Sequence, residues 1–214
     1  MIRTRMTLLG AVLLASCTQG RDAPARHAAT IQDIRAIATG TPVTVEGIVS
    51  VRSGVIDAGF AITDGEAGIH VAADSTTRVA AGERVRVTGT RGDIHGLATV
   101  IPNHVERLGT GKLPQPKTAR TGEVGEATEG LMVRVSGRAV TPIVRDLPYG
   151  YKLWIDDGSG RLQLFVAASA GTLGLDRARV GSTVTVTGFS GQYDATYEVI
   201  PASRAVLQVS AAPQ

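Results

Sequence analysis

The sequence predicts an all-β protein built from two tandem five-stranded Greek-key barrels, and three observations support this fold class. The 214 residues include 26 glycines and only 4% aromatic residues, which is typical of strands joined by glycine-rich turns. Valine and threonine recur in alternation, whereas long helical blocks are absent. The chain also contains an internal duplication. Together these features favour two small modules of the same β architecture.

The duplication covers most of each module. The sequence "GERVRVTG" at 82–89 matches "GSTVTVTG" at 181–188, and "VIP" recurs at 100–102 and 199–201. Between the flanking blocks, "FAITDGEAGIHV" at 60–71 aligns with "LWIDDGSGRLQL" at 153–164. We therefore expect both modules to have the same order of strands.

Each module is expected to begin with a short helical segment. Thr30 and Asp33 have the spacing of a capping box, and Gly40 predicts the end of the segment. A strand is expected around 42–51, followed by a hairpin, a loop and strands near 83–90 and 97–107. Five strands in about 80 residues, with glycines at the bends, predict an OB-fold barrel. An SH3-like barrel or a small sandwich is the alternative.

The acidic sequences Asp64-Gly65 and Asp157-Gly158 are predicted to be hairpin turns rather than metal-binding loops. Alternating apolar runs flank both sequences, and Asp-Gly between such runs is a strong hairpin signal. An EF-hand loop needs carboxylates or amides at alternate positions before its glycine and a glutamate farther on. Neither copy provides them, so the turn interpretation is favoured.

The domain boundaries follow from the duplication and from composition. We predict unit 1 at 30–108, a linker at 109–119, unit 2 at 120–209 and a short tail at 210–214. The linker sequence "GTGKLPQPKTA" is polar and rich in glycine and proline, as expected for a connection between modules.

The first 17 residues resemble a bacterial lipoprotein signal peptide. A basic start, "MIRTR", precedes a ten-residue apolar run that is too short to span a bilayer. Leu14-Ala15-Ser16-Cys17 is similar to a lipobox. This resemblance implies a lipid, including palmitate, on Cys17, a flexible tether at 18–29 and a periplasm-facing position in the cell envelope. By the same resemblance, Thr18 favours the outer membrane in a Gram-negative host. An ordinary secretory signal with an incidental cysteine is the alternative.

Unit 2 also resembles a known class of module. The sequences "TGEVGEATEGLMVRVSG", "DDGSGRLQLFV" and "VGSTVTVTGFSGQYDATYEVIP" are similar to OB-fold-like modules of secreted bacterial proteins. Such modules are appended to extracellular nucleases and phosphoesterases or to sensor ectodomains, and the resemblance implies nucleic-acid binding. Unit 1 matches more loosely, and a fold by itself does not specify a function.

The sequence offers no motif for catalysis. It contains no Gly-x-Ser-x-Gly elbow and no phosphate-binding loop, and Cys17 is the only cysteine. His70, His95 and His104 lack the tight spacing of metal ligands. The net charge of +3 falls to +1 if Arg3 and Arg5 leave with the signal peptide, so charge alone does not indicate nucleic acid. We therefore expect a non-enzymatic protein with no metal and no cofactor; a metal-assisted hydrolase that uses the unit 1 histidines is a distant alternative.

The contrast between the two modules identifies a candidate binding surface. Strand alternation places Leu153, Ile155, Leu162, Leu164 and Val166 inside the second barrel. The outer face then carries Lys152, Trp154, Arg161, Gln163 and Phe165, and a neighbouring loop adds Phe189, Tyr193 and Tyr197. The matching outer positions of unit 1 are mostly small: Gly59, Ala61, Gly68, His70 and Ala72.

Several ligands fit such a surface. Aromatic side chains stack on bases and cations contact phosphates, so a single-stranded oligonucleotide or another polyanion is the leading hypothesis. A glycan is an alternative, since the same aromatics stack on sugar rings. Another protein of the envelope is a further alternative, because tryptophan, tyrosine and arginine also anchor protein interfaces. A fourth interpretation is that Trp154 and Phe165 pack against unit 1.

Overall fold

The structure is a computed structural model, and it describes residues 29–203 and 206–211. The predicted signal peptide, Cys17 and all of the predicted tether except Ala29 lie outside the described residues. Within the described part of the chain, no helix is both long enough and apolar enough to cross a membrane.

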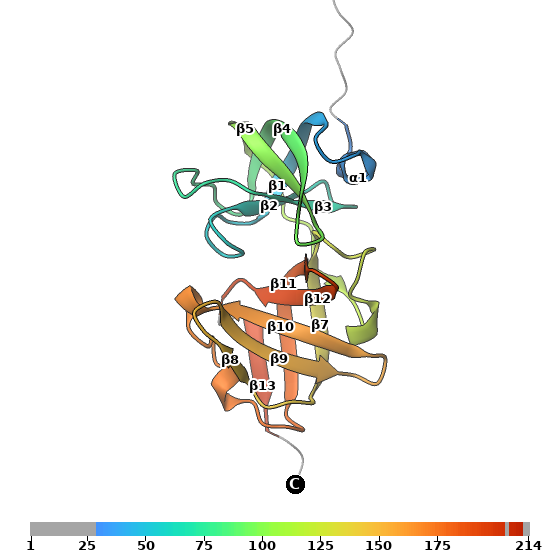
Figure 1. Cartoon of the computed structure of the whole chain (residues 1–214), viewed down its shortest axis with the longest axis vertical. Helices are drawn as coiled ribbons and strands as arrows, with labels where there is room; N and C mark the ends of the chain where they lie inside the picture. The colour runs from blue at the N-terminus through green and yellow to red at the C-terminus, as the bar shows by residue number, and fades with distance from the viewer. Residues whose placement is uncertain (1–28, 204–205, 212–214) are drawn as a thin grey trace, which may run out of the picture.

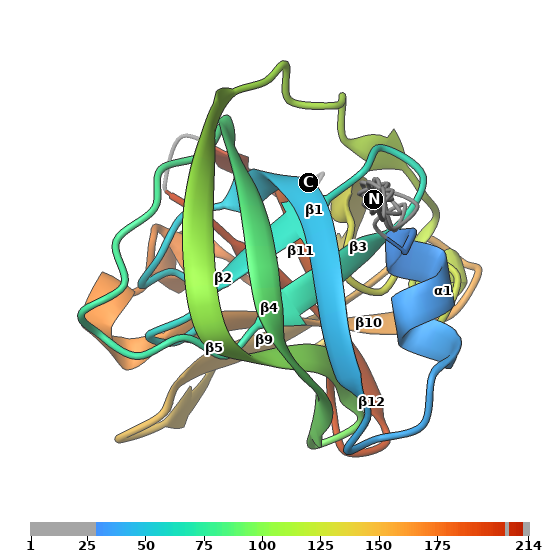
Figure 2. The ribbon, with the colours of Figure 1, turned by 90° about the horizontal axis from the view of Figure 1, so that it is seen from above.

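Unit 1 is a closed five-stranded barrel preceded by one short helix. The strand order is β1-β2-β3-β5-β4, with β1 and β4 closing the ring and β3 running parallel to β5. Figure 2 shows α1 beside β1 and β3, at the edge of this barrel. The elements are α1 (Ile31–Ala36), β1 (Pro42–Val51), β2 (Phe60–Thr63), β3 (Gly68–Val71), β4 (Glu83–Ile94) and β5 (Leu97–Thr110).

Unit 2 repeats this ring in the same order. β7 pairs with β9, β9 with β10, β10 with β12, β12 with β11, and β11 with β7. The parallel pair, β10 and β12, again consists of the third and fifth ring strands counted along the chain. The elements are β6 (Lys117–Thr118), η1 (Thr121–Glu123), β7 (Met132–Ala139), β8 (Val144–Asp146), β9 (Gly150–Asp156), β10 (Arg161–Ala167), η2 (Ala168–Ala170), η3 (Leu175–Arg177), β11 (Thr183–Tyr193), β12 (Thr196–Pro201) and β13 (Leu207–Ser210).

The predicted fold class is confirmed, with two differences in detail. The helical segment of unit 1 is a capped α-helix whose Thr30 and Asp33 form the expected capping box, whereas the matching segment of unit 2 is the 3-10 turn η1. The long strand β5 has two counterparts in unit 2, β12 and β13, and both pair with β11.

Both Asp-Gly sequences are turns, and both aspartates also fix the helical segment of their barrel. Gly65 and Gly158 have φ values of +104° and +93°, which glycine adopts without strain. Asp64 Oδ2 accepts a hydrogen bond from the backbone N–H of Ile31 at 3.1 Å. At the matching place in unit 2, Asp157 accepts one from the Thr121 hydroxyl at 2.8 Å.

These contacts explain the acidic turns without a metal. Hydrogen bonds from Ser159 and Thr121 hold the pKa of Asp157 well below its usual range, and they outweigh the opposing effect of burial. The aspartates are therefore structural anchors that join each hairpin to the start of its own barrel.

The two barrels contact each other directly and lie one above the other in Figure 1. Side chains of both units form a shared apolar cluster, in which Phe189 is fully buried. The backbones of Gly68 and Gly130 approach so closely that a Cβ on either residue would clash with the other. The cluster consists of Val51, Ala61 and Leu97 of unit 1 with Phe189 and Ile200 of unit 2, bordered by Val55, Ile56, Met132 and Phe165.

The connection between the barrels is shorter than predicted, because β5 continues to Thr110 and β6 begins at Lys117. Residues 111–116 have no regular secondary structure and are largely exposed. We expect a protease to cut first within 111–116 and the two fragments to stay associated through the apolar cluster. Size-exclusion chromatography of the nicked protein measures this association.

Phe189→Ala supplies the matching variant for this experiment. Truncation of a buried phenylalanine costs about 3–5 kcal/mol, and here much of the lost packing lies between the units. The nicked variant should elute as separate fragments. Separate elution of the nicked wild-type fragments would contradict the proposed strength of the contact.

Candidate functional site

The outer face of the second barrel holds an open pocket of about 480 Å³. β9 and β10 form one wall with Trp154, Arg161 and Gln163, and the β11–β12 hairpin forms the opposite side with Tyr197. We call this hollow the Trp154 pocket. Its remaining lining residues are Thr121, Gly122, Val124, Thr141, Leu162, Ala195 and Thr196.

Strand alternation places these side chains as expected. Leu153, Ile155, Leu162, Leu164 and Val166 are all buried in the core of the second barrel. Trp154 and Gln163 have the opposite parity and lie directly across from each other in the antiparallel β9–β10 pair. Their side chains therefore share one face of the sheet. Trp154 is half-buried, so part of the indole remains accessible.

A buried polar pair lies beside Trp154. Gln163 Nε2 donates a hydrogen bond to Glu198 Oε2 at 2.6 Å, and both residues are 6% exposed. The two residues are register partners in the parallel β10–β12 pair. Burial raises the pKa of Glu198, while the hydrogen bond from Gln163 and the charge of Lys152 act in the opposite direction.

The pocket contains one unpaired cation. Arg161 is exposed and, within the described part of the chain, forms no ion pair with a carboxylate. Lys152 is different, because its Nζ lies 2.6 Å from Asp146 Oδ2. Arg161 is therefore the side chain best placed to meet an anion at this pocket.

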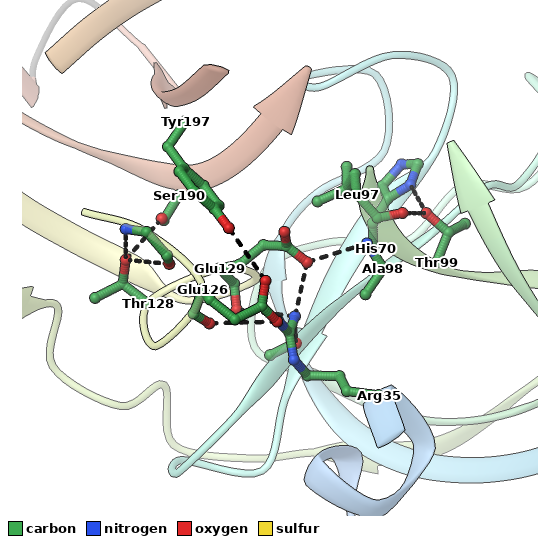
Figure 3. A network of polar contacts seen from close by, with 12 residues as sticks. Arg35, His70, Leu97, Ala98, Thr99, Glu126, Thr128, Glu129, Ser190 and Tyr197 are labelled. Atoms are coloured by element: carbon green, nitrogen blue, oxygen red, sulfur yellow. Dashed lines mark hydrogen bonds and ion pairs between the residues drawn. The ribbon is translucent and has the colours of Figure 1, made fainter. Parts of the chain in front are cut away.

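Tyr197 links the pocket to unit 1. Its hydroxyl donates to Glu126 Oε2 at 3.1 Å, and Arg35 Nη2 of unit 1 lies 2.6 Å from Glu126 Oε1. Arg35 Nη1 also reaches Glu129 at 2.9 Å, and that carboxylate accepts from the Ala98 backbone N–H at 3.0 Å. Figure 3 shows these contacts, which lead from Tyr197 through Glu126 to Arg35 of unit 1 and back to Glu129 of unit 2. The position of the tyrosine ring thus depends on the contact between the barrels.

The other predicted binding residues do not join the pocket. Phe189 is fully buried and Phe165 borders the same apolar cluster between the barrels. Tyr193 stacks on His95 of unit 1, with ring centroids 4.3 Å apart. Lys152 pairs with Asp146.

The predicted surface is therefore divided in this structure. Trp154, Arg161, Gln163 and Tyr197 converge on the pocket. The assignment of Phe189 to the binding surface is wrong, because the side chain is completely buried against unit 1 and leaves no surface for a ligand. The packing interpretation applies to Phe165, whose ring lies against the apolar cluster, and does not apply to Trp154, which lines the open pocket.

The matching face of unit 1 is covered. Ala61 is fully buried in the inter-barrel cluster, and Gly68 lies against Gly130 of unit 2. His70 is also buried, and its ring nitrogens lie 3.3 Å from Thr99 Oγ1 and from Asp57 Oδ1. Unit 1 thus uses for docking the face that unit 2 leaves open.

The unit 1 histidines have separate environments. Among the described residues, no three histidine, cysteine, aspartate or glutamate side chains form a group able to hold a metal ion. His95 Nδ1 instead lies 3.1 Å from Asp194 Oδ1 across the barrel contact.

No known protein family matches this sequence, and no curated protein matches it significantly. Several solved structures resemble it weakly. The p204 HINb domain matches 81% of this chain and 100% of its own, with 12% identity and a TM-score of 0.38. A murine DNA-binding protein, solved with double-stranded DNA, matches 81% of this chain and 97% of its own, with 12% identity and a TM-score of 0.40. The hypothetical protein ygiW from E. coli matches 40% of this chain and 94% of its own, with 16% identity and a TM-score of 0.33. At these identities and TM-scores, the likenesses do not bear on what this chain binds.

Sequence reasoning did not identify Glu198 as part of the site. Alternation gave it an outward position in "YEVIP", where a glutamate is ordinarily a solvated surface residue. Its isolation among apolar neighbours was the available signal. Its partner Gln163 lies 35 residues away in the chain, so only the barrel brings the two together.

The raised pKa of Glu198 predicts a pH-dependent stability. The folded state binds this proton more tightly than the unfolded state, whose glutamate has an ordinary pKa near 4.5. The contribution of Glu198 to the free energy of unfolding therefore falls as pH rises above about 4.5, until the folded-state pKa is passed. We expect Glu198→Gln to lack this loss, because the amide stays neutral.

Urea unfolding of wild type and Glu198→Gln between pH 4 and pH 7 measures the effect. The variant should gain stability relative to wild type as pH rises. Glu66→Gln, at an exposed position of the unit 1 turn, is the control and should not reproduce the gain. A constant difference between Glu198→Gln and wild type would contradict the burial argument.

Proposed function

We propose that this is a non-catalytic binding protein of the cell envelope, anchored through a lipid on Cys17, whose Trp154 pocket binds single-stranded nucleic acid. The observation that carries the ligand proposal is the combination of a partly exposed indole and an unpaired guanidinium in one open pocket. Indoles stack on any base, and cations contact the phosphate between bases. Trp154 would hold a base, and Arg161 would contact a neighbouring phosphate.

A glycan is the second candidate, and the scarcity of free cations favours it. Lys152 is neutralised by Asp146, which leaves Arg161 as the unpaired cation that lines the pocket. A neutral ligand does not need cations for its binding, and a tryptophan face stacks on a sugar ring as well as on a base. Salt dependence separates the two candidates.

Trp154 reports on its own pocket, because it is the only tryptophan of the chain. We expect an oligonucleotide to quench its fluorescence by stacking. With one phosphate contact, at Arg161, the log–log salt slope should be roughly −0.7. Loss of the stacking ring in Trp154→Ala, followed by electrophoretic mobility shift, should cost about 1–3 kcal/mol of binding free energy.

Tyr149→Ala is the matched control, since this aromatic side chain is 71% exposed and lies outside the pocket. It should bind like wild type. Quenching by oligosaccharides with no salt dependence would replace nucleic acid by glycan as the ligand. An emission that neither ligand class changes would overturn the pocket as a binding site.

The lipid anchor has a separate test. The lipobox-like sequence Leu14-Ala15-Ser16-Cys17 leads us to expect palmitate labelling of the wild-type protein in its host. Cys17→Ala should lose the label, because no other cysteine is present. Equal labelling of the two proteins would exclude Cys17 as the attachment point.

A further inference from the structure

Gln163 lines the Trp154 pocket, and one side of its amide is already engaged. Its Nε2 donates to Glu198 Oε2 at 2.6 Å. An ionised carboxylate only accepts hydrogen bonds, so above its pKa Glu198 must face the nitrogen of the amide. This contact fixes which end of Gln163 is oxygen and which is nitrogen.

The oxygen of the same amide has no partner in the protein. Within residues 29–203 and 206–211, no group donates to Gln163 Oε1. This oxygen is also absent from the fully enclosed atoms that lack a partner, which are Ser50 Oγ, Arg91 Nε and Glu129 Oε2. Gln163 is only 6% exposed, and the surface that it retains lines the Trp154 pocket. A buried residue thus presents a free acceptor to the pocket.

The position of this acceptor relative to Trp154 suggests what it recognises. Gln163 and Trp154 are direct partners across β9 and β10, with Cβ atoms about 4.5–5.5 Å apart in such pairs. A ring stacked on the indole would therefore have its edge near the glutamine amide. A ligand group that meets Oε1 must be a hydrogen-bond donor, and the remaining Nε2 hydrogen suits an adjacent acceptor.

We propose that Gln163, positioned by Glu198, makes the Trp154 pocket selective for adenine, through its N6 amine and N7. This inference rests on the proposed binding of single-stranded nucleic acid. A glutamine amide matches the N6 donor and N7 acceptor of adenine in a bidentate pair. Guanine presents O6 and N7, two acceptors, at the same edge, and thymine presents O4 beside a methyl group. At the corresponding edge, cytosine presents its N4 amine beside the C5–H group, which offers no second contact to the amide.

Glu198 determines the orientation of the Gln163 amide, and thereby which base the amide can recognise. If the amide turned over, Oε1 would face the carboxylate and two acceptors would be in contact. Turning would also remove the hydrogen bond that satisfies a nearly buried carboxylate, which is costly at a low-dielectric site. Glu198 is therefore a positioning residue, and Gln163 is the residue that contacts the base.

The test compares two oligonucleotides that differ by one donor group. One is a decamer of deoxyadenosine, and the other carries unsubstituted purine, which lacks the N6 amine, at every position. Trp154 quenching measures both affinities at pH 7.5. We expect wild type to bind the adenine decamer roughly ten-fold or more tightly, as a good bidentate contact implies. Gln163→Leu should bind the two decamers equally.

Glu198→Gln tests the positioning role without removing polarity or volume. A glutamine at 198 both donates and accepts, so it satisfies either orientation of the Gln163 amide. The adenine preference should fall several-fold, while the purine decamer binds as it does to wild type. Gln192→Leu, which removes a glutamine outside the pocket, should keep the full preference.

The outcomes separate this inference from the proposed function. Quenching by both decamers with equal affinities in wild type would overturn the adenine selectivity and leave nucleic-acid binding intact. Quenching by neither decamer would overturn the proposed function itself. A full preference in Gln163→Leu would assign the selectivity to another residue, and a full preference in Glu198→Gln would remove the positioning role.

Discussion

The ion pair between Arg35 and Glu129 is the contact on which the arrangement of this protein depends. Arg35 comes from α1 of the first barrel, and Glu129 lies just before β7 of the second. Their side chains are 8% and 1% exposed and lie 2.9 Å apart. Removal of Arg35 would leave the buried Glu129 carboxylate without its ion-pair partner, and breaking a buried pair in this way typically costs about 3–5 kcal/mol. Burial raises the pKa of Glu129, and the Ala98 N–H and Arg35 act against that rise. The barrels must therefore stay in the relative position that keeps these two buried charges in contact.

That position gives two copies of one barrel different surfaces. In unit 1 the outer face of β2 and β3 carries small residues such as Ala61 and Gly68, and the second barrel covers it. In unit 2 the corresponding face carries larger side chains, and only the end near Phe165 is covered. Trp154 lies toward the open end. Duplication thus supplies both a docking face and a pocket from the same strand pattern.

The pocket and the barrel contact are parts of one polar system. Tyr197 borders the pocket and bonds to Glu126, which pairs with Arg35. Glu198 is the next residue along β12, and it accepts a hydrogen bond from Gln163, which lines the pocket. Neighbouring residues of one strand therefore serve the inter-barrel network and the ligand surface.

The sequence by itself determined the barrels, their strand order and the turns, because these follow from local rules. Alternation assigned Leu153 and Ile155 to the core, the repeat required the same ring twice, and Asp-Gly marked each hairpin. Alternation could not show which outward residues stay accessible, since it defines inside and outside only within one barrel. Phe189 and Trp154 both have aromatic side chains and were both assigned to the binding surface, yet the first is buried and the second lines a pocket. The tertiary structure decided between them, because the residues that cover Phe189, such as Ala61 and Leu97, lie about 90 or more positions away in the chain. The pairing of Gln163 with Glu198 has the same origin, since a parallel strand contact brings together side chains that no local pattern connects.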